Sequence, residues 1–474
     1  MQAWIVEETA TADLGDERLN QRYRLILDRL GSQPSRSIPA ACRGRADVEA
    51  TYRFFDNPRV TEAAILASHA AAAEQRIARE SVVLIPQDTT EIDLTRPEQV
   101  VGGPLSDPHR VGLLCHVLLA ITPAGVPLGV VGGATWWRDA ETFGESAATR
   151  KHKSIDEKES RRWVDGYRRC CALARSAPGT CVVSVSDSEG DVYECFAEAA
   201  AQGHAAKFIV RACQDRRLTS NENEPAKLFE RVRSVAALGS FAVEASARRA
   251  TTGDDRKRRQ SRSARTATVS VRATTVTLHP PYRPDGKLPA VEVNLVLVRE
   301  DNPPAGEEPI EWLLVTDLAA PDFAAAKQCV EYYTRRWDVE IYFRVLKSGC
   351  GVEKLRLESS ERVVNALAVY RVVAWRVLSV LMLGRKCPEM PCDVVLEEEE
   401  WKAVYQVVTG EKPPRRPPPL GEMVRMIAGL GGYLDRPHDP PPGPKAMWIG
   451  LQQVRAFAMA WLAFGPGAKP RCVE

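Results

Sequence analysis

The chain has 474 residues, 44% of them hydrophobic and 27% charged, a composition typical of folded globular proteins and not of disordered or fibrous ones. Because a chain of this length is too long to fold around one ordinary hydrophobic core, we expect about two to four domains. The net charge of +2 excludes a globally basic nucleic-acid-binding protein, so any surface for a polyanion must be local.

Residues 1 to about 75 have the pattern of a small helical domain. Asp16 is placed to cap a helix that carries Tyr23 and Leu27, and Gly31 lies just past the expected end of that helix. The segment interleaves core residues with arginines, namely Arg18, Arg22, Arg24, Arg36, Arg43, Arg45 and Arg53. Such arginines are typical of a module that contacts DNA phosphates. Solvated arginines on an amphipathic domain are the alternative, and these residues alone favour neither.

From about residue 80 the pattern becomes that of strands and helices. Val82–Ile85 predicts a short buried strand, and the turn residues 122–125 predict a β-hairpin. The further expected elements are hairpin strands at Val111–Ile121 and Val126–Val131, a helix at Glu157–Ala174, and strands at Val182–Asp187 and Phe208–Arg211. A ribonuclease H-like core, which is an α/β fold, has this order: three antiparallel strands, a helix, and then further strands alternating with helices.

Two of these strands are expected to end in an aspartate, Asp88 and Asp187. Carboxylates at neighbouring strand ends can converge, and oxygen ligands are what Mg²⁺ or Mn²⁺ requires. Together with Glu340 they would form a cluster of three carboxylates. Each aspartate alone is more often a turn or helix-cap residue. Glu189 and Asp191 compete with Asp187, which we prefer because it follows the apolar alternation directly.

Residues 212 to 309 have the pattern of a β-rich insertion. Its alternating segments are Phe241–Val243, Ala267–Val271, Thr275–Leu278 and Val291–Leu297. The insertion also contains the basic run Arg256–Arg262. A run of this kind is often a solvated loop, but beside a metal site it could follow a DNA backbone.

Residues 333–347 carry Tyr333, Arg336, Glu340 and Lys347 at offsets of three, seven and fourteen. On one continuous helix these four side chains would fall within an arc of roughly 60°. A carboxylate between two cations and a phenol is suited to holding a metal ion and binding phosphates. A solvated charged face is the alternative, so the pattern needs support from the rest of the chain.

The C-terminal part, from about residue 371, is expected to form helices separated by proline-rich loops. The apolar run Val363–Leu383 is interrupted by Arg371 and Arg376, which favours a buried helix over a membrane span. No signal peptide is predicted at the N-terminus. The twelve cysteines have no Cys-x-x-Cys spacing, so we expect reduced thiols in a cytosolic protein.

These residues together resemble a known family, the bacterial insertion-sequence transposases of the IS-four family, most closely the Tn-five type. The resemblance covers nearly the whole chain, and the Tyr-Arg-Glu-Lys spacing is its most specific element. Its other elements are Leu14–Asp16, Tyr52–Asn57, Asp88–Thr90, Trp136–Arg138, the Asp187 strand end, Trp312–Thr316 and Ile427–Asp435.

The resemblance implies a DDE transposase that cuts and pastes DNA through a hairpin on the transposon end. Asp88, Asp187 and Glu340 would be the catalytic triad, holding two Mg²⁺ or Mn²⁺ ions. The phosphate contacts would be Tyr333, Arg336, Lys347, Arg211 and Thr316. Trp312 would stack on a flipped base, although its strand-like setting alone favours a core residue.

The resemblance also implies a division into three domains and a set of partners. Residues 1–75 would bind the DNA end, residues 76–370 would form the catalytic core, and residues 371–474 would dimerise. The partners would be the terminal inverted repeats, the target DNA and a second copy of the chain, in the bacterial cytoplasm at the nucleoid and without a membrane. Two alternatives remain open, a catalytically silent repressor of transposition and a metal-dependent nuclease without strand transfer.

Overall fold

The computed structural model describes residues 2–96, 99–141, 143–144, 153–219, 226–245, 247, 263–283 and 286–466. The chain divides into two compact units. Unit 1 contains Met1–Val83, Asp88–Gly144 and Trp337–Glu474, and unit 2 contains Leu84–Gln87 and Glu145–Arg336. The basic run at 256–262 lies outside the described residues, so its predicted role stays open.

The described strands are β1 (Val82–Asp93), β2 (Gly103–Pro104), β3 (Val111–Ile121), β4 (Pro127–Trp136), β5 (Cys181–Ser186), β6 (Lys207–Arg211), β7 (Gly239–Ala245), β8 (Arg265–Leu278), β9 (Val291–Glu300) and β10 (Glu311–Thr316). Their hydrogen-bonded order is β2-β3-β1-β5-β6-β10-β9-β8-β7, and β4 pairs with β3. The β3–β4 pair is antiparallel and the β5–β6 pair is parallel. This arrangement confirms the predicted ribonuclease H-like α/β core.

The predicted strands are present, with two corrections. Strand β1 continues to Asp93, so Asp88 lies inside the strand; what ends at Gln87 is its fully buried part. In the insertion, β8 is one strand where two were expected, because Arg272, Ala273 and Thr274 keep an unbroken ladder with β9. The insertion strands extend the core sheet, since β10 pairs with both β6 and β9.

The predicted continuous helix at 333–347 is wrong. Helix α10 (Phe323–Thr334) ends before Arg335, α11 (Trp337–Arg344) begins after a two-residue turn, and a π-helical turn, η4 (Val345–Gly349), follows. The amides of Arg335 and Arg336 bond three residues back instead of four, which interrupts the α-helical ladder. Tyr333, Arg336, Glu340 and Lys347 therefore do not share the face of one helix.

The N-terminal segment folds as the helices α1 (Ala3–Glu8), α2 (Glu17–Ser32), α3 (Ile38–Ala41), α4 (Arg45–Phe55) and α5 (Glu62–Ile77). Asp16 caps α2 as predicted, since its side chain accepts the Arg18 amide. Gly31 lies inside α2 and not past its end. A Cβ at Gly31 would lie 2.7 Å from the Trp4 ring, so this glycine allows α1 and α2 to pack closely.

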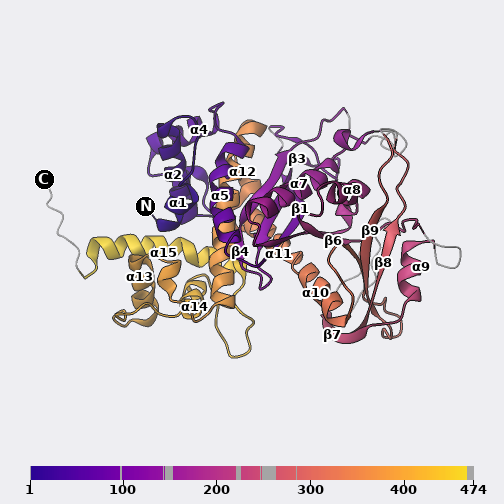
Figure 1. Ribbon diagram of the computed structural model, residues 1–474. Coiled ribbons are helices and arrows are strands. Elements are labelled where there is room, and N and C mark those ends of the chain that lie inside the picture. The colour runs from indigo at the N-terminus through magenta and orange to yellow at the C-terminus, as the bar shows by residue number, and fades with distance from the viewer. Residues whose placement is uncertain are drawn as a thin grey trace. The chain divides into compact units, whose positions relative to one another are not determined.

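Helix α12 (Ser360–Lys386) runs through unit 1 beside α5 (Figure 1). Among the described residues it is the one helix long and apolar enough to cross a membrane, and it is largely buried inside the unit, as the interrupting arginines predicted. Helices α13 (Glu398–Thr409), α14 (Leu420–Leu430) and α15 (Pro444–Phe464) pack on one another through their own apolar cluster. The predicted C-terminal helices are thus confirmed.

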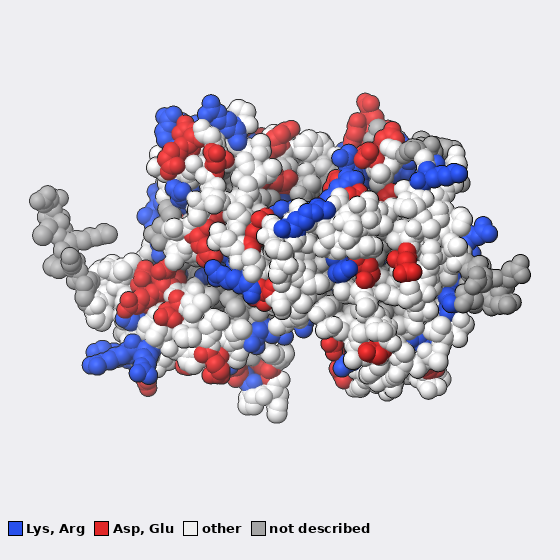
Figure 2. Space-filling model, in the orientation of Figure 1, with Lys and Arg blue, Asp and Glu red and all other residues white. Residues whose placement is uncertain are grey.

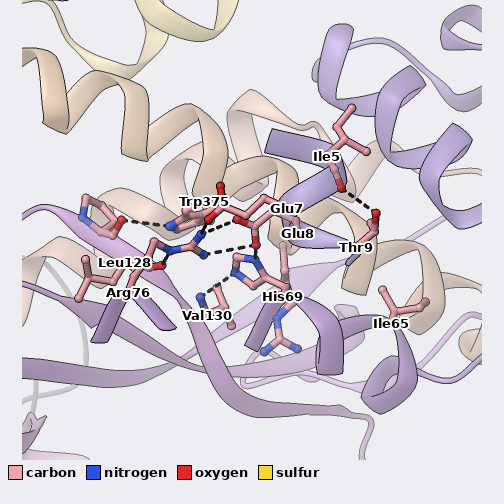
Figure 3. Close-up of polar contacts among 12 residues, drawn as sticks. Ile5, Glu7, Glu8, Thr9, Ile65, His69, Arg76, Leu128, Val130 and Trp375 are labelled. Carbon is pink, nitrogen blue, oxygen red and sulfur yellow. Dashed lines mark hydrogen bonds and ion pairs between the residues drawn. The ribbon is translucent and has the colours of Figure 1, made fainter. Parts of the chain in front are cut away.

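A buried polar network fastens α1 to α5 and β4 (Figure 3). The His69 Nε2 atom accepts the Val130 amide at 2.9 Å, so the ring proton is on Nδ1 and is donated to Glu8. The Arg76 guanidinium also binds Glu8, at 2.8 Å, and lies 4.6 Å from the centre of the Trp375 ring. Burial alone would raise the pKa of Glu8, but pairing with His69 and Arg76 outweighs it and lowers that pKa.

Unit 2 contains a buried ion pair in the loops that follow β5 and β6. Asp191 has no exposed side-chain surface, and its carboxylate accepts the Arg216 guanidinium at 2.6 Å. The same carboxylate accepts the amides of Cys213 and Gln214, each at 2.9 Å. Helices α7 (Arg161–Ser176) and α8 (Tyr193–Ala201) of this unit pack on each other, and α9 (Leu228–Ser234) belongs to the insertion. Asp191 therefore joins two loops of the core.

Replacing Glu8 with alanine should strongly destabilise unit 1. His69 and Arg76 would lose their common carboxylate in a buried setting, which costs about 3–5 kcal/mol of unfolding free energy. Because the folded-state pKa of Glu8 is lowered, its contribution is present above the ordinary carboxyl pKa and is lost as the pH falls through the folded value. Chemical denaturation at neutral and acidic pH measures the loss of unfolding free energy and its dependence on pH. Glu7→Ala, which removes an exposed partner of Arg76, is the control and should cost under about 1 kcal/mol.

Replacing Asp191 with alanine should cost about 3–5 kcal/mol, because Arg216 would be left buried without its counter-ion. Asp187→Ala should cost about 1 kcal/mol, since that half-buried side chain caps only the short turn η2 (Ser188–Gly190). Urea denaturation of both variants provides the comparison. Equal losses would contradict the structural role assigned to Asp191.

Candidate active site and DNA-binding surface

The ends of two parallel strands place Asp187 beside Arg211 in unit 2. Ser186 on β5 is in register with Val210 on β6, so the residue that follows each is also a neighbour. Asp187 comes directly after β5, as predicted, and uses one carboxylate oxygen to accept the Glu189 amide at 2.8 Å. Both side chains are half-buried. A carboxylate and a cation thus lie at the same edge of the sheet.

Tyr333 is the centre of this cluster. Burial raises the pKa of its phenol, while Arg211 and Arg336 act in the opposite direction and Asp187 raises it further. The rings of Tyr333 and Trp312 meet edge to face with their centres 6.1 Å apart. The structure therefore brings together five residues that the sequence had singled out: Asp187, Arg211, Trp312, Tyr333 and Arg336.

The structure distinguishes Asp187 from its two competitors. Asp191 is fully buried and its oxygens are occupied by Arg216 and two amides, so it holds the loops together. Glu189 is exposed and pairs with Arg162 at 2.9 Å. Asp187 is the carboxylate that combines partial exposure with a position directly at the strand end.

Thr316 needs a correction. Its side chain is fully buried, and its hydroxyl donates to the Phe208 carbonyl at 2.6 Å and accepts the Leu318 amide at 3.1 Å. Because both functions of the hydroxyl are used inside the sheet, Thr316 is not placed to meet a phosphate. Trp312, in contrast, is half-buried at the start of β10 and not enclosed in the core.

Asp88 belongs to unit 1 and lies where β1 changes from buried to half-exposed. The neighbouring Thr89 hydroxyl bonds to Nδ1 of His116 on β3 at 2.9 Å, and His116 is almost fully buried. This bond ties β1 to β3 at the residue after Asp88. Sequence reasoning missed His116, because only strand pairing brings it opposite Thr89.

Glu340 and Lys347 also belong to unit 1. Glu340 is exposed on α11. Lys347, on the π-turn, donates to the Glu91 carbonyl at 2.8 Å and pairs with Glu353 at 3.1 Å. Glu353 was not singled out from the sequence either, since a lone glutamate six residues after a lysine carries no recognisable pattern.

The three acidic residues have the donor chemistry that Mg²⁺ or Mn²⁺ requires, namely carboxylate oxygens that are exposed or half-exposed. Asp88 and Glu340 lie in unit 1, whereas Asp187 lies in unit 2. Within the described part of the chain, no group of three or more His, Cys, Asp or Glu side chains is assembled to hold a metal ion. The donor set fits the metal by its chemistry.

The N-terminal helices of unit 1 form a hollow of about 400 Å³ lined by Arg18, Arg22, Arg53 and Arg59. Arg18 and Arg22 pair with carboxylates. Asp16 also lines the hollow and interacts with the charge of Arg59, whereas Arg53 and Arg59 donate their hydrogen bonds to backbone carbonyls. Figure 2 shows basic side chains interspersed with acidic ones over α2 and α4. The hollow is therefore a local cationic surface. This agrees with the expectation, drawn from the low net charge, that any surface for a polyanion is local.

Comparison with known proteins gives three family matches along the chain. Residues 1–60 match the "Transposase DNA-binding" model, residues 197–375 match the "Transposase DDE domain" model, and residues 372–462 match the "Transposase Tn5 dimerisation domain" model. The DDE match contains Glu340, Arg211 and Trp312, whereas Asp88 and Asp187 precede it.

A solved structure, described as a piggyBac transposase synaptic complex with hairpin DNA, aligns with 99% of this chain and 82% of its own, at 10% identity and a TM-score of 0.35. A likeness of that degree establishes nothing about the chemistry of this chain. The three family matches are independent of it, cover most of the sequence and confirm the resemblance found in the motifs. The protein is a DDE transposase of the Tn5 type in the IS-four family, an enzyme that cuts and joins DNA in transposition.

Proposed function

We propose that this transposase excises a DNA element by cut-and-paste, with Asp88, Asp187 and Glu340 as its metal-binding catalytic triad. The observation that carries the proposal is the cluster at the ends of β5 and β6, where Asp187 lies among Arg211, Arg336 and Tyr333. A carboxylate next to several cationic and phenolic groups is suited to a phosphodiester, because the cations balance the charge that develops on the phosphate oxygens.

The residues of the unit 2 cluster have different roles in holding the phosphate. Arg211 is half-exposed and can reach a phosphate directly. Tyr333 and Arg336 are buried; Tyr333 hydrogen-bonds with Arg211 and so orders it, and the guanidinium of Arg336 adds positive potential. Asp88, Asp187 and Glu340 would hold two divalent ions, which would supply activation of a water or of a DNA 3′-hydroxyl and stabilisation of the leaving oxygen.

Trp312 is proposed to stack on a base flipped out of the duplex when the excised end closes as a hairpin. Its ring is half-buried and rests edge to face on Tyr333, which leaves part of it accessible beside the phosphate cluster. Stacking on an aromatic ring is worth about 1–3 kcal/mol per base and does not require a particular sequence.

The N-terminal hollow is proposed to bind the terminal inverted repeat. It lies within the segment that matches the transposase DNA-binding family, and Arg53 and Arg59, which donate to backbone carbonyls, can also meet phosphates. The C-terminal helices are proposed to pair two copies of the chain. They match the dimerisation family and expose apolar side chains, namely Val407, Val408, Met459, Leu462 and Phe464. The protein would act on chromosomal DNA in the bacterial cytoplasm.

Two alternatives to this proposal have less support. A nuclease without strand transfer would need neither the DNA-binding match at one end nor the dimerisation match at the other. A silent repressor has no observation in its favour, since the three acidic residues are all present.

Alanine at Asp88, Asp187 or Glu340 should abolish cleavage while leaving binding to the DNA end within about twofold. Each change removes a metal ligand and not a phosphate contact. The test is cleavage of a plasmid carrying the DNA that flanks this gene, with Mn²⁺ or Mg²⁺, beside a gel-shift assay on the same ends. Retained cleavage in any variant would remove that residue from the triad, and end binding without cuts by the wild type would favour the repressor.

Alanine at Arg53 or Arg59 should weaken end binding and lower the salt dependence of the binding constant by about one ion per arginine. The reason is that a variant with one guanidinium fewer displaces about one counter-ion fewer from the DNA when it binds. Titrations of end DNA at several salt concentrations measure the slope. Arg175→Ala, an arginine of α7 in unit 2, is the control and should leave it unchanged.

A further inference from the structure

Lys347 is held in place by two contacts inside unit 1. Its ammonium donates to the backbone carbonyl of Glu91 on β1 at 2.8 Å and pairs with the Glu353 carboxylate at 3.1 Å. The side chains of Lys347 and Glu353 are 29% and 31% exposed, so solvent and a bound ligand can reach this pair. The ammonium is thus fixed against the backbone of β1, the strand that carries Asp88.

Glu353 is itself anchored to the same strand. It lies in the short turn η5 (Val352–Lys354), and its carboxylate accepts the Asp93 amide at 3.2 Å. Gly351, with φ +64°, makes the left-handed turn that brings η5 back toward η4, a conformation that favours glycine. One oxygen of Glu353 therefore joins the backbone of β1 to the ammonium of Lys347.

A lysine side chain has four rotatable bonds and loses much rotamer freedom when its ammonium meets a phosphate. A carboxylate that already fixes the ammonium removes most of that loss before DNA binds. We propose that Glu353 is a positioning residue that holds Lys347 ready for the phosphate next to the scissile bond. The inference rests on the proposed function and on the phosphate contact that the family resemblance implies for Lys347.

The test is a double-mutant cycle of Glu353→Gln and Lys347→Ala. Glutamine keeps the size of the side chain and an oxygen for the Asp93 amide, so the turn is expected to fold, and thermal unfolding checks this. Glu358→Gln is the matched control, because it makes the same charge change at an exposed glutamate that pairs with Arg362 instead. All variants are compared for single-turnover cleavage of end DNA and, separately, for end-DNA affinity, which requires no cleavage.

Relative to Glu358→Gln, Glu353→Gln should reduce cleavage by about 3- to 30-fold and weaken end-DNA binding, and neither effect should appear in the Lys347→Ala background. Equal losses in both backgrounds would show a structural role and overturn the proposal. A gain in cleavage or affinity would show instead that Glu353 competes with the phosphate, and an unchanged variant would overturn the proposal outright. If the wild type binds ends without cutting them, the proposed function fails, and the affinity cycle still decides the role of Glu353.

Discussion

The architecture of unit 1 depends on the hydrogen bonds that several buried polar side chains of one helix, α12, make with other parts of the unit. Asn365 donates to the carbonyls of Phe55 and Val60, and Trp375 donates to the Pro127 carbonyl. The guanidinium of Arg371 is completely buried and binds Glu62 and the Gly132 carbonyl. Because a buried polar group without a partner is costly, these contacts favour the observed position of α12 over others that would break them. That position orders the N-terminal helices, the β-hairpin and, through the bond from Tyr342 to the Arg371 carbonyl, helix α11.

This constraint organises several segments of the chain to which a role in transposition is matched or proposed. The segment that matches the DNA-binding family, the C-terminal helices, Asp88 and Glu340 all belong to the unit organised around α12. Asp187 and the cluster proposed to bind phosphate belong to the other unit, and the chain passes between the two at Arg336 and Trp337. The break between α10 and α11 that separates Tyr333 from Glu340 is therefore also the boundary between the two units.

Much of the fold could be predicted from local patterns. Strands β3 and β6, the cap at Asp16 and the burial of α12 follow from alternation, capping chemistry and an apolar run interrupted by arginines. Where an element extends beyond its predicted boundary, contacts with a distant part of the chain are the reason. Strand β8 continues through polar residues because β9 supplies its hydrogen bonds, and α2 continues through Gly31 because Trp4 packs there. Of the candidate site, the grouping of Asp187 with Arg211 could be anticipated from strand ends, whereas the burial of Thr316 could not.

The sequence alone determined the chemical groups of this protein, their spacing and its family, because motifs such as the Tyr-Arg-Glu-Lys series and the Asp88–Thr90 segment are properties of the chain. The tertiary structure decided which groups are available. It buried Asp191 and Thr316 with internal partners, broke the helix between Tyr333 and Glu340, and placed His116 and Glu353 against β1. The physical reason is that burial and hydrogen bonding depend on residues far apart in sequence, so whether a carboxylate or hydroxyl is free to act is settled only when the chain is packed.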